Sequence, residues 1–164
     1  MLAHALSIPA ESRAMTDAHI RRATMGDLDA LVELENSVFE VERMSARQLR
    51  RHLESLSAEV FVATRERRVV GAAVLFFRRA SNVARLYSIA VAPSERGGGI
   101  GEGLLVAAEQ AARRRGSRSL RLEVRSDNAG AQRLYERHGY HHFGLHRAYY
   151  EDGHDAQRYE KALA

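Results

Sequence analysis

The sequence contains no cysteine and no tryptophan. Without cysteine the chain can form no disulfide, no thiolate nucleophile, no iron–sulfur cluster and no cysteine-ligated zinc site, and the cytoplasm is the compartment to expect. Lysine is almost as scarce, because Lys161 is the only lysine among 25 basic residues. A Walker-type phosphate loop needs a lysine after its glycines, so that class of nucleotide site is excluded.

Long apolar runs are also missing. No stretch approaches the roughly 20 apolar residues of a membrane span, which predicts a soluble protein with no membrane partner. Residues 1–18 lack the basic start and apolar run of a signal peptide, so we expect a flexible leader, with translation beginning at Met1 or at Met15. Residues 19–164 then fit one domain, and a hydrophobic content of 45% is enough to build its core.

The formal charge is modest, at +4, although the chain is rich in arginine. A positive balance suits an anionic small molecule. Nucleic-acid binding would call for clustered arginines with interleaved aromatic residues, whereas the arginines here are scattered along the chain. We therefore expect no nucleic-acid partner.

Hydrophobic periodicity indicates one continuous α/β pattern without internal repeats. The nearly continuous apolar runs at 69–77 and 83–91 are typical of central strands covered on both faces. The helix that starts at Ser45 should bury Leu49, Leu53 and Leu56 on one stripe. Together these patterns predict a mixed sheet flanked by helices. Strands are expected at 19–23, 59–64, 69–77, 83–91, 120–125, 140–146 and 154–161, and helices at 28–38, 45–56, 99–115 and 128–139.

The most informative segment is 89–101, which reads Ile-Ala-Val-Ala-Pro-Ser-Glu-Arg-Gly-Gly-Gly-Ile-Gly. It leads a buried strand into a helix through residues that allow close approach to the backbone. The free N–H groups at the start of a helix form a ready anion site. Three successive glycines cost conformational entropy on folding, so a purely structural turn rarely needs all three. The dinucleotide pattern G-x-G-x-x-G fails here in every register.

The pattern that does fit is Arg-x-x-Gly-x-Gly at Arg96, Gly99 and Gly101, preceded by Ile-Ala-Val-x-Pro. This loop resembles the acetyl-CoA loop of the GNAT superfamily of N-acetyltransferases. The resemblance continues through Leu-Glu-Val-Arg-x-x-Asn at 122–128, through 131–140 and through 147–150, and covers residues 20–163 in all. It is strongest to the branch that acetylates protein amino termini, typified by the ribosomal-protein alanine N-acetyltransferases. It implies a GNAT-like fold, with a central, mostly antiparallel sheet, one splayed strand pair and flanking helices.

The resemblance also implies roles for individual residues. Glu123 matches the general base of that branch, and Tyr135 matches the acid. Phe39, Tyr149 and Tyr150 match residues that line the acceptor site. Acetyl-CoA is implied as co-substrate and no metal is required. The positions that match cofactor contacts are Ile89, Ala90, Val91, Arg96, Gly97, Gly98, Gly99, Ile100, Gly101, Glu102 and Asn128.

From the residues alone, the two catalytic positions have ordinary alternatives. Strand alternation places Glu123 on the outer face, where a surface glutamate paired with Arg121 or Arg125 is the plain interpretation. For Tyr135 the periodicity favours an ordinary core tyrosine on the inner side of its helix. The five histidines between 138 and 154 show no metal-ligand spacing, so no metal site is predicted.

The predicted activity is transfer of an acetyl group to a primary amine, on a protein or peptide amino terminus. Direct attack in a ternary complex is expected, because a chain without cysteine cannot form a thiol acyl-enzyme. One segment departs from the branch, which usually has a Pro-Trp pair after the phenylalanine that matches Phe39. Here residues 39–44 read Phe-Glu-Val-Glu-Arg-Met. Small-molecule amines therefore remain an alternative acceptor, as does a catalytically silent acyl-CoA sensor, and the acyl chain length and oligomeric state stay open.

Overall fold

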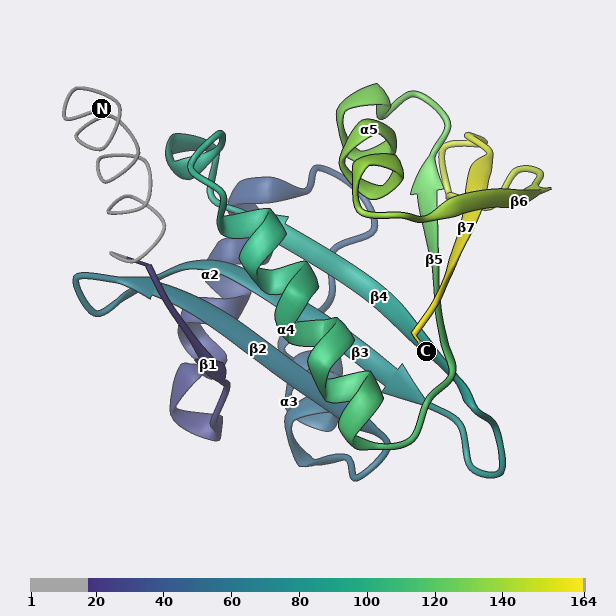
Figure 1. Cartoon of the computed structure of the whole chain (residues 1–164). Coiled ribbons are helices and arrows are strands. Elements are labelled where there is room, and N and C mark those ends of the chain that lie inside the picture. Colours follow the sequence, from purple (N-terminus) through teal and green to yellow (C-terminus); the bar gives the residue numbers. More distant parts are fainter. Residues whose placement is uncertain (1–17, 164) are drawn as a thin grey trace, which may run out of the picture.

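A computed structural model describes residues 18–163. Its centre is a seven-stranded sheet in the order β1-β2-β3-β4-β5-β7-β6, with helices on both faces (Figure 1). All neighbouring strands are antiparallel except β4 and β5. The mixed, mostly antiparallel sheet predicted from the sequence is therefore confirmed. The strands are β1 (His19–Arg22), β2 (Ala58–Arg65), β3 (Arg68–Phe77), β4 (Val83–Val91), β5 (Ser119–Arg125), β6 (His141–His146) and β7 (Ala156–Ala162), and the helices are η1 (Met25–Asp27), α2 (Leu28–Val38), α3 (Ala46–Glu54), η2 (Pro93–Glu95), α4 (Ile100–Arg114) and α5 (Ala129–Arg137).

Strands β4 and β5 separate after a short stretch of pairing. Their parallel ladder joins only Val83–Leu86 to Ser119–Leu122, whereas β4 continues to Val91. At the point of separation β4 also carries one extra residue, because Val74 of β3 pairs with Ser88 while Leu75 pairs with Leu86. The extra residue, Tyr87, is a β-bulge, and bulges bend a strand and increase its twist. The predicted splayed pair is thus present, and Figure 1 shows β5 leaving the plane of β4 toward α5.

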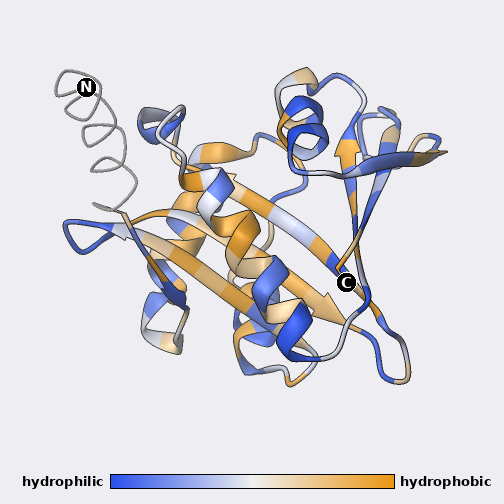
Figure 2. Ribbon diagram, viewed as in Figure 1, coloured by the Kyte–Doolittle hydropathy of each residue, from blue (hydrophilic) through white to orange (hydrophobic). Residues whose placement is uncertain are grey.

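Two apolar layers hold the helices to the sheet. On one face α4 packs over the sheet, and its buried side chains join those of β2 to β5, β7 and α5 in a single core. On the other face α2 and α3 cover a second core, which contains residues of β2, β3 and β4 but none of β5, β6 or β7. Figure 2 shows the apolar colour concentrated on β2, β3, β4 and the helices against them. One face of the β5-β7-β6 half is therefore left without a helix.

Two expectations about these layers are wrong. The prediction that the strand at 83–91 is covered on both faces fails at Tyr87, which is 42% exposed, because β5 has already moved away. Leu56, expected on the buried stripe of the second helix, is 91% exposed, because α3 ends at Glu54. Leu49 of the same stripe is buried as predicted.

The helix ends follow the signals in the sequence. Ser45 caps α3, accepting a hydrogen bond from the Gln48 amide, and Asn128 caps α5 in the same way. Thr24 precedes η1, which leads directly into α2. Within residues 18–163, no helix has the length and hydropathy needed to cross a membrane. The predicted leader, apart from Ala18, and both candidate start residues lie outside the described part of the chain.

Candidate active site

A pocket of about 650 Å³ opens where β4 and β5 separate. Its walls come from both faces of the sheet, so the pocket passes through the gap between the two strands. Arg85 and Glu123 reach it from the face that bears α2, and Leu86 and Val124 from the face that bears α4. Seven of the residues singled out in the sequence line this pocket: Phe39, Ile89, Glu123, Asn128, Tyr135, Tyr149 and Tyr150.

Glu123 lies on β5, one residue beyond the last residue paired with β4. Its side chain is only 9% exposed, and its carboxylate forms ion pairs with the guanidiniums of Arg85 and, at 3.9 Å, Arg158. Arg121 and Arg125 pair with other carboxylates. The interpretation of Glu123 as a surface glutamate paired with Arg121 or Arg125 is therefore wrong.

Arg85 is the site residue that sequence reasoning missed. Its guanidinium contacts the Tyr149 hydroxyl as well as Glu123, and among the described residues nothing hydrogen-bonds its buried Nε. Burial lowers the pKa of Arg85, but the charge of Glu123 and the contact with Tyr149 more than offset this, so the pKa lies above its ordinary value. The signal was available, since Arg85 is the only charged residue in the apolar run 83–91.

Tyr135 lies on α5 and is 8% exposed. Its ring meets the edge of the Tyr140 ring at a centroid distance of 5.7 Å, so it packs in the core while also lining the pocket. Burial raises the pKa of Tyr135, which keeps the phenol protonated at neutral pH. No other group in residues 18–163 hydrogen-bonds its hydroxyl, which leaves this proton free to be donated inside the pocket.

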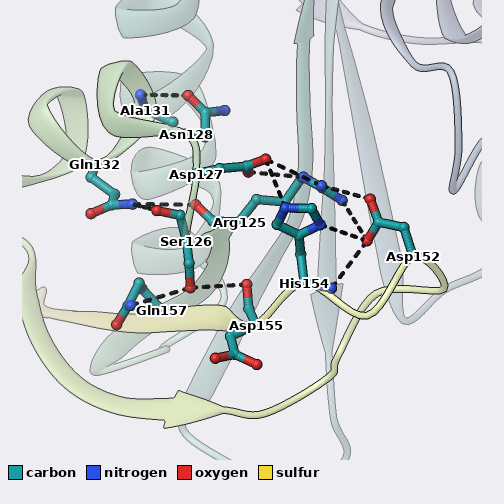
Figure 3. Close-up of polar contacts among 10 residues, drawn as sticks. All are labelled: Arg125, Ser126, Asp127, Asn128, Ala131, Gln132, Asp152, His154, Asp155 and Gln157. Atoms are coloured by element: carbon teal, nitrogen blue, oxygen red, sulfur yellow. Dashed lines mark hydrogen bonds and ion pairs between the residues drawn. The ribbon is translucent and has the colours of Figure 1, made fainter.

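The loop between β6 and β7 closes the pocket, and a cluster of charged residues holds it in place (Figure 3). Arg125 at the end of β5 binds Asp152 of the loop at 2.7 Å and Asp127 at 3.1 Å. His154 contacts the same two carboxylates, at 3.1 Å and 3.3 Å respectively. The Arg125 guanidinium also lies 5.0 Å from the ring centroid of Tyr150, and burial raises the pKa of that tyrosine to about 12. This cluster therefore fixes the loop that presents Tyr149 and Tyr150 to the pocket.

The segment that departs from the family pattern contacts this same loop. Glu42, with a φ of 61°, accepts a hydrogen bond from the Glu151 amide at 2.6 Å. Phe39, Glu40, Val41 and Glu42 all line the pocket. The wall opposite β5 is thus built by residues 39–42 and the β6–β7 loop together.

The second half of β4 presents backbone N–H groups to the gap. The amide of Ala92 donates to the Val70 carbonyl of β3 at 2.8 Å. Because backbone groups alternate along a strand, the amide of Ala90 also faces β3, whereas those of Ile89 and Val91 face the side that β5 has left. The side chain of Ala90 is buried in the core beneath α2 and α3. Ile89 and Val91 therefore offer N–H groups to a ligand between the strands, and Ala90 does not.

The glycine loop lies beside the pocket rather than in its lining. Gly97 and Gly99 have φ values of 84° and 82°, a region that favours glycine, and Gly99 is the N-cap of α4. No heavy atom lies within 4 Å of where a Cβ on Gly97 would be, so the loop has room for a ligand. A Cβ on Gly101 would lie 3.8 Å from side-chain atoms of Val91 and Leu134, which places the start of α4 against β4 and α5.

These features fit the diphosphate of an acyl-CoA, because the free N–H groups of a 15-residue helix face an uncrowded loop. The other predicted contacts are spread around this helix start. Arg96 and Gly98 belong to the loop, Ile100 is 3% exposed in the core, and Glu102 lies 3.6 Å from Arg137 and 3.8 Å from His138 of the α5 region. Within the described residues no three histidine, aspartate or glutamate side chains gather as a metal site, and the absence of a metal requirement stays a prediction.

Comparison with known proteins gives consistent matches. The sequence profile of the acetyltransferase (GNAT) family matches residues 28–140. A relative from Bacillus subtilis (strain 168), named as a candidate ribosomal protein bS18-alanine N-acetyltransferase, is 30% identical over 86% of this chain and 93% of its own length. The crystal structure of the ribosomal-protein-S18-alanine N-acetyltransferase from Escherichia coli superposes with a TM-score of 0.81 at 27% identity, covering 90% of this chain and 94% of the other. Ard1 from Thermoplasma volcanium superposes with a TM-score of 0.82 at 25% identity, covering 90% and 99%.

Proposed function

The chain belongs to the acetyltransferase (GNAT) family and is an N-acetyltransferase, and from that premise we propose that it moves an acetyl group from acetyl-CoA to the α-amine at the amino terminus of a protein or peptide. The observation that carries this proposal is the pocket between β4 and β5. It brings a carboxylate, a protonated phenol and the free amides of a splayed strand to one place. The ribosomal-protein acceptors in the names of the Bacillus subtilis and Escherichia coli relatives favour a protein amino terminus over other amines.

In this proposal the cofactor is held by the chain's own backbone. The Gly97–Gly101 loop and the first turn of α4 bind the diphosphate, since their N–H groups are free. Asn128, at the start of α5, lines the pocket on the way to the gap. Bound acetyl-CoA supplies an activated acetyl thioester. The amides of Ile89 and Val91 then stabilise negative charge that develops on the thioester oxygen.

Two side chains move the protons. An amine must lose a proton before it can attack, and Glu123 accepts that proton directly or through a water molecule. Tyr135 donates its phenolic proton to the departing thiolate, and its burial keeps that proton in place until then. Attack is direct, within a ternary complex, because the chain has no cysteine to carry the acetyl group.

A panel of acceptors tests the proposal. Purified protein is incubated with acetyl-CoA and either amino-terminal peptides, the same peptides with a blocked amino terminus, or free amino acids, polyamines and aminoglycosides. Release of free thiol and the mass of the product are measured together. We expect acetylation of the free peptides and none of the blocked ones. Thiol release with the small amines alone would instead favour a small-molecule acceptor, and no release with any amine would favour an acyl-CoA sensor.

The small-molecule alternative has one observation in its favour. Residues 39–42 replace the usual Pro-Trp segment, and the Glu42 contact with the Glu151 amide closes this wall onto the β6–β7 loop. A closed wall suits a compact acceptor better than an extended chain. The acceptor panel distinguishes a peptide acceptor from a small-molecule acceptor, because the free and blocked peptides differ only in the availability of the α-amine.

A further inference from the structure

The face of β5 and β7 that no helix covers carries a second cleft, of about 510 Å³. This cleft shares Arg85, Glu123 and Tyr149 with the active-site pocket. From Glu123 it continues over Arg121 and Arg158 toward the turn after β3. An acceptor whose amine lies at Glu123 would therefore find the rest of its chain beside this cleft.

Positive charge dominates the cleft. Four arginines line it, namely Arg78, Arg85, Arg121 and Arg158, and Glu123 is the only carboxylate in the lining. One further carboxylate, Glu160, pairs with Arg121 at 2.5 Å from outside the lining. Four guanidiniums thus face two carboxylates, and within residues 18–163 Arg78 forms no ion pair. On this count two positive charges are left for a ligand.

Phe143 holds two of these arginines in position. The guanidinium of Arg121 lies 5.1 Å from the centroid of the Phe143 ring, and that of Arg158 lies 4.8 Å from it. Phe143 is the extra residue of a bulge in β6, since His142 pairs with Tyr159 and Gly144 with Arg158. A ring beneath a guanidinium restrains its plane and leaves its N–H edge free for a carboxylate.

The spacing suits an extended peptide. Arg158 pairs directly with Glu123 across β5 and β7, and Arg121 lies two residues from Glu123 on the same face of β5. Two residues of a strand span about 7 Å, and an extended acceptor advances at nearly the same rate. With the amine at Glu123, acceptor residues close to the amino terminus therefore come within reach of Arg158 and Arg121.

The opposite wall of the active-site pocket carries carboxylates. Glu35 accepts from the Met44 amide at 3.0 Å and Glu42 from the Glu151 amide at 2.6 Å, whereas Asp152 pairs with Arg125. Among the described residues, Glu35, Glu40 and Glu42 have no cationic partner. The unpaired positive charge therefore lies in the second cleft and not on this wall, so the cleft is the part of the site that suits acidic side chains.

From these observations we infer that the acceptor is a polypeptide with acidic side chains close to its amino terminus, bound by the arginines of this cleft. The inference rests on the proposed function and names the class of amino terminus that the site selects. Positive charge near a site also attracts acidic acceptors over a distance and speeds their encounter with the site.

Three peptides of equal length test the inference, beginning Ala-Asp-Glu, Ala-Gln-Gln and Ala-Lys-Arg. We expect kcat/KM to fall in that order, with a difference of about tenfold between the acidic and the neutral peptide at low ionic strength and a smaller one in high salt. The double variant Arg78→Gln/Arg121→Gln should lose most of this preference, measured as the ratio of kcat/KM for the acidic peptide to that for the neutral peptide. The matched control, Arg47→Gln/Arg50→Gln, removes the same charge from the exposed face of α3 and should keep it.

Two results would overturn the inference. Peptides acetylated without regard to charge, or with a preference for Ala-Lys-Arg, would refute it and leave the proposed function standing. Acetylation of free amino acids or other small amines, with none of the peptides modified, would refute the proposed acceptor and the inference with it. The charge-reversed variant Arg121→Glu gives an independent measurement, because it should move the preference toward the basic peptide.

Discussion

The two halves of the sheet are built differently. Strands β1 to β4 lie between α4 on one face and α2 and α3 on the other, and both layers are apolar. Strands β5 and β7 share only the layer on the α4 side, and no residue of β6 belongs to either layer. The residues of β2 are accordingly buried one after another from Ala58 to Ala63, whereas those of β5 alternate between buried and half-buried.

This difference in helix coverage decides where charged functional side chains can lie on the sheet. A strand covered on both faces has no room for a charged side chain without a partner. A strand covered on one face can present charges every second residue, and β5 does so with Arg121, Glu123 and Arg125. The proposed catalytic groups lie where the doubly covered half meets the singly covered half, so they are partly shielded from water yet open to substrates.

The largest expected effect, on turnover, comes from replacing the proposed base and acid at this junction. Glu123→Gln and Tyr135→Phe should each lower turnover by about 10²–10⁴-fold, the usual contribution of a positioned base or acid. Measurement is by initial rate with both substrates saturating. Affinity for the cofactor should change much less, because the phosphates are held by the Gly97–Gly101 loop.

A matched control separates the acid role of Tyr135 from a core role. Tyr159→Phe removes another buried hydroxyl from the same core, one that donates to Glu136 at 3.2 Å. It should cost some stability and leave turnover nearly intact. Wild-type turnover in a folded Tyr135→Phe protein, with chemistry limiting, would leave Tyr135 as a core residue only.

The next largest effect is expected on acetyl-CoA affinity. It is tested by comparing glycine substitutions at the two ends of α4. Gly97→Val places a side chain in a loop with a φ of 84°, and Gly116→Val does the same at the far end of the helix, where φ is 82°. A Cβ would meet no atom within 4 Å at either position, so backbone strain is matched. We expect calorimetry to show at least about a tenfold loss of acetyl-CoA affinity for Gly97→Val alone. Equal affinity in the two folded variants would contradict the placement of the diphosphate.

Much of this arrangement could be predicted from the sequence, because local signals decide it. The caps at Ser45 and Asn128 set helix ends by hydrogen bonds within a few residues, and Gly99 begins α4 through its positive φ. The apolar runs at 69–77 and 83–91 predicted the positions of β3 and β4. The family resemblance identified Glu123 and Tyr135, which alternation and periodicity alone could not distinguish from a surface glutamate and a core tyrosine.

What could not be predicted depends on contacts between distant segments. Arg85 is 38 residues from Glu123 in the chain, and no local pattern indicates that the two form an ion pair. The bulge at Tyr87 depends on the register between β3 and β4. The exposure of Leu56 depends on where α3 ends, and boundaries of elements are set by packing as much as by periodicity.

A smaller effect, on stability alone, is expected in the doubly covered half. Asp27 pairs with Arg21 at 2.8 Å and accepts a hydrogen bond from the Thr24 amide, contacts that lower its pKa to about 2. A lowered pKa in the folded state stabilises the protein above the unfolded value near 4 and is lost as the pH falls toward 2. Asp27→Asn should therefore reduce the free energy of unfolding by about 1–2 kcal/mol at neutral pH, and by less in acid.

Chemical denaturation at several pH values measures this loss, and Asp29→Asn, at an exposed position of the same helix region, is the control. Activity per folded molecule should be unchanged in both variants. A large loss of turnover in folded Asp27→Asn would contradict this division, because it would show that the doubly covered half, β1 to β4, contributes to catalysis through Asp27 as well as to stability.

The smallest effect is expected at the loop that closes the pocket. Asp152→Asn removes the ion pair that ties this loop to Arg125 at the end of β5, and with it some of the order of Tyr149 and Tyr150. An exposed pair of this kind contributes little, so we expect KM for the acceptor to rise about threefold while turnover and cofactor affinity stay close to wild type. Asp127→Asn is the matched control, because Asp127 binds the same guanidinium from the turn after β5 rather than from the loop.

The pH dependence of KM further tests the role of the ion pair between Asp152 and Arg125. Hydrogen bonding to Arg125 holds the pKa of Asp152 below its ordinary value, so the carboxylate is charged from mildly acidic pH upward and the link is lost only in strong acid. The rise in KM caused by Asp152→Asn should therefore be the same throughout the neutral range. An acidic limb in the rate that survives this substitution must then arise elsewhere, and its loss in Glu123→Gln would assign it to the carboxylate at the junction of the two halves.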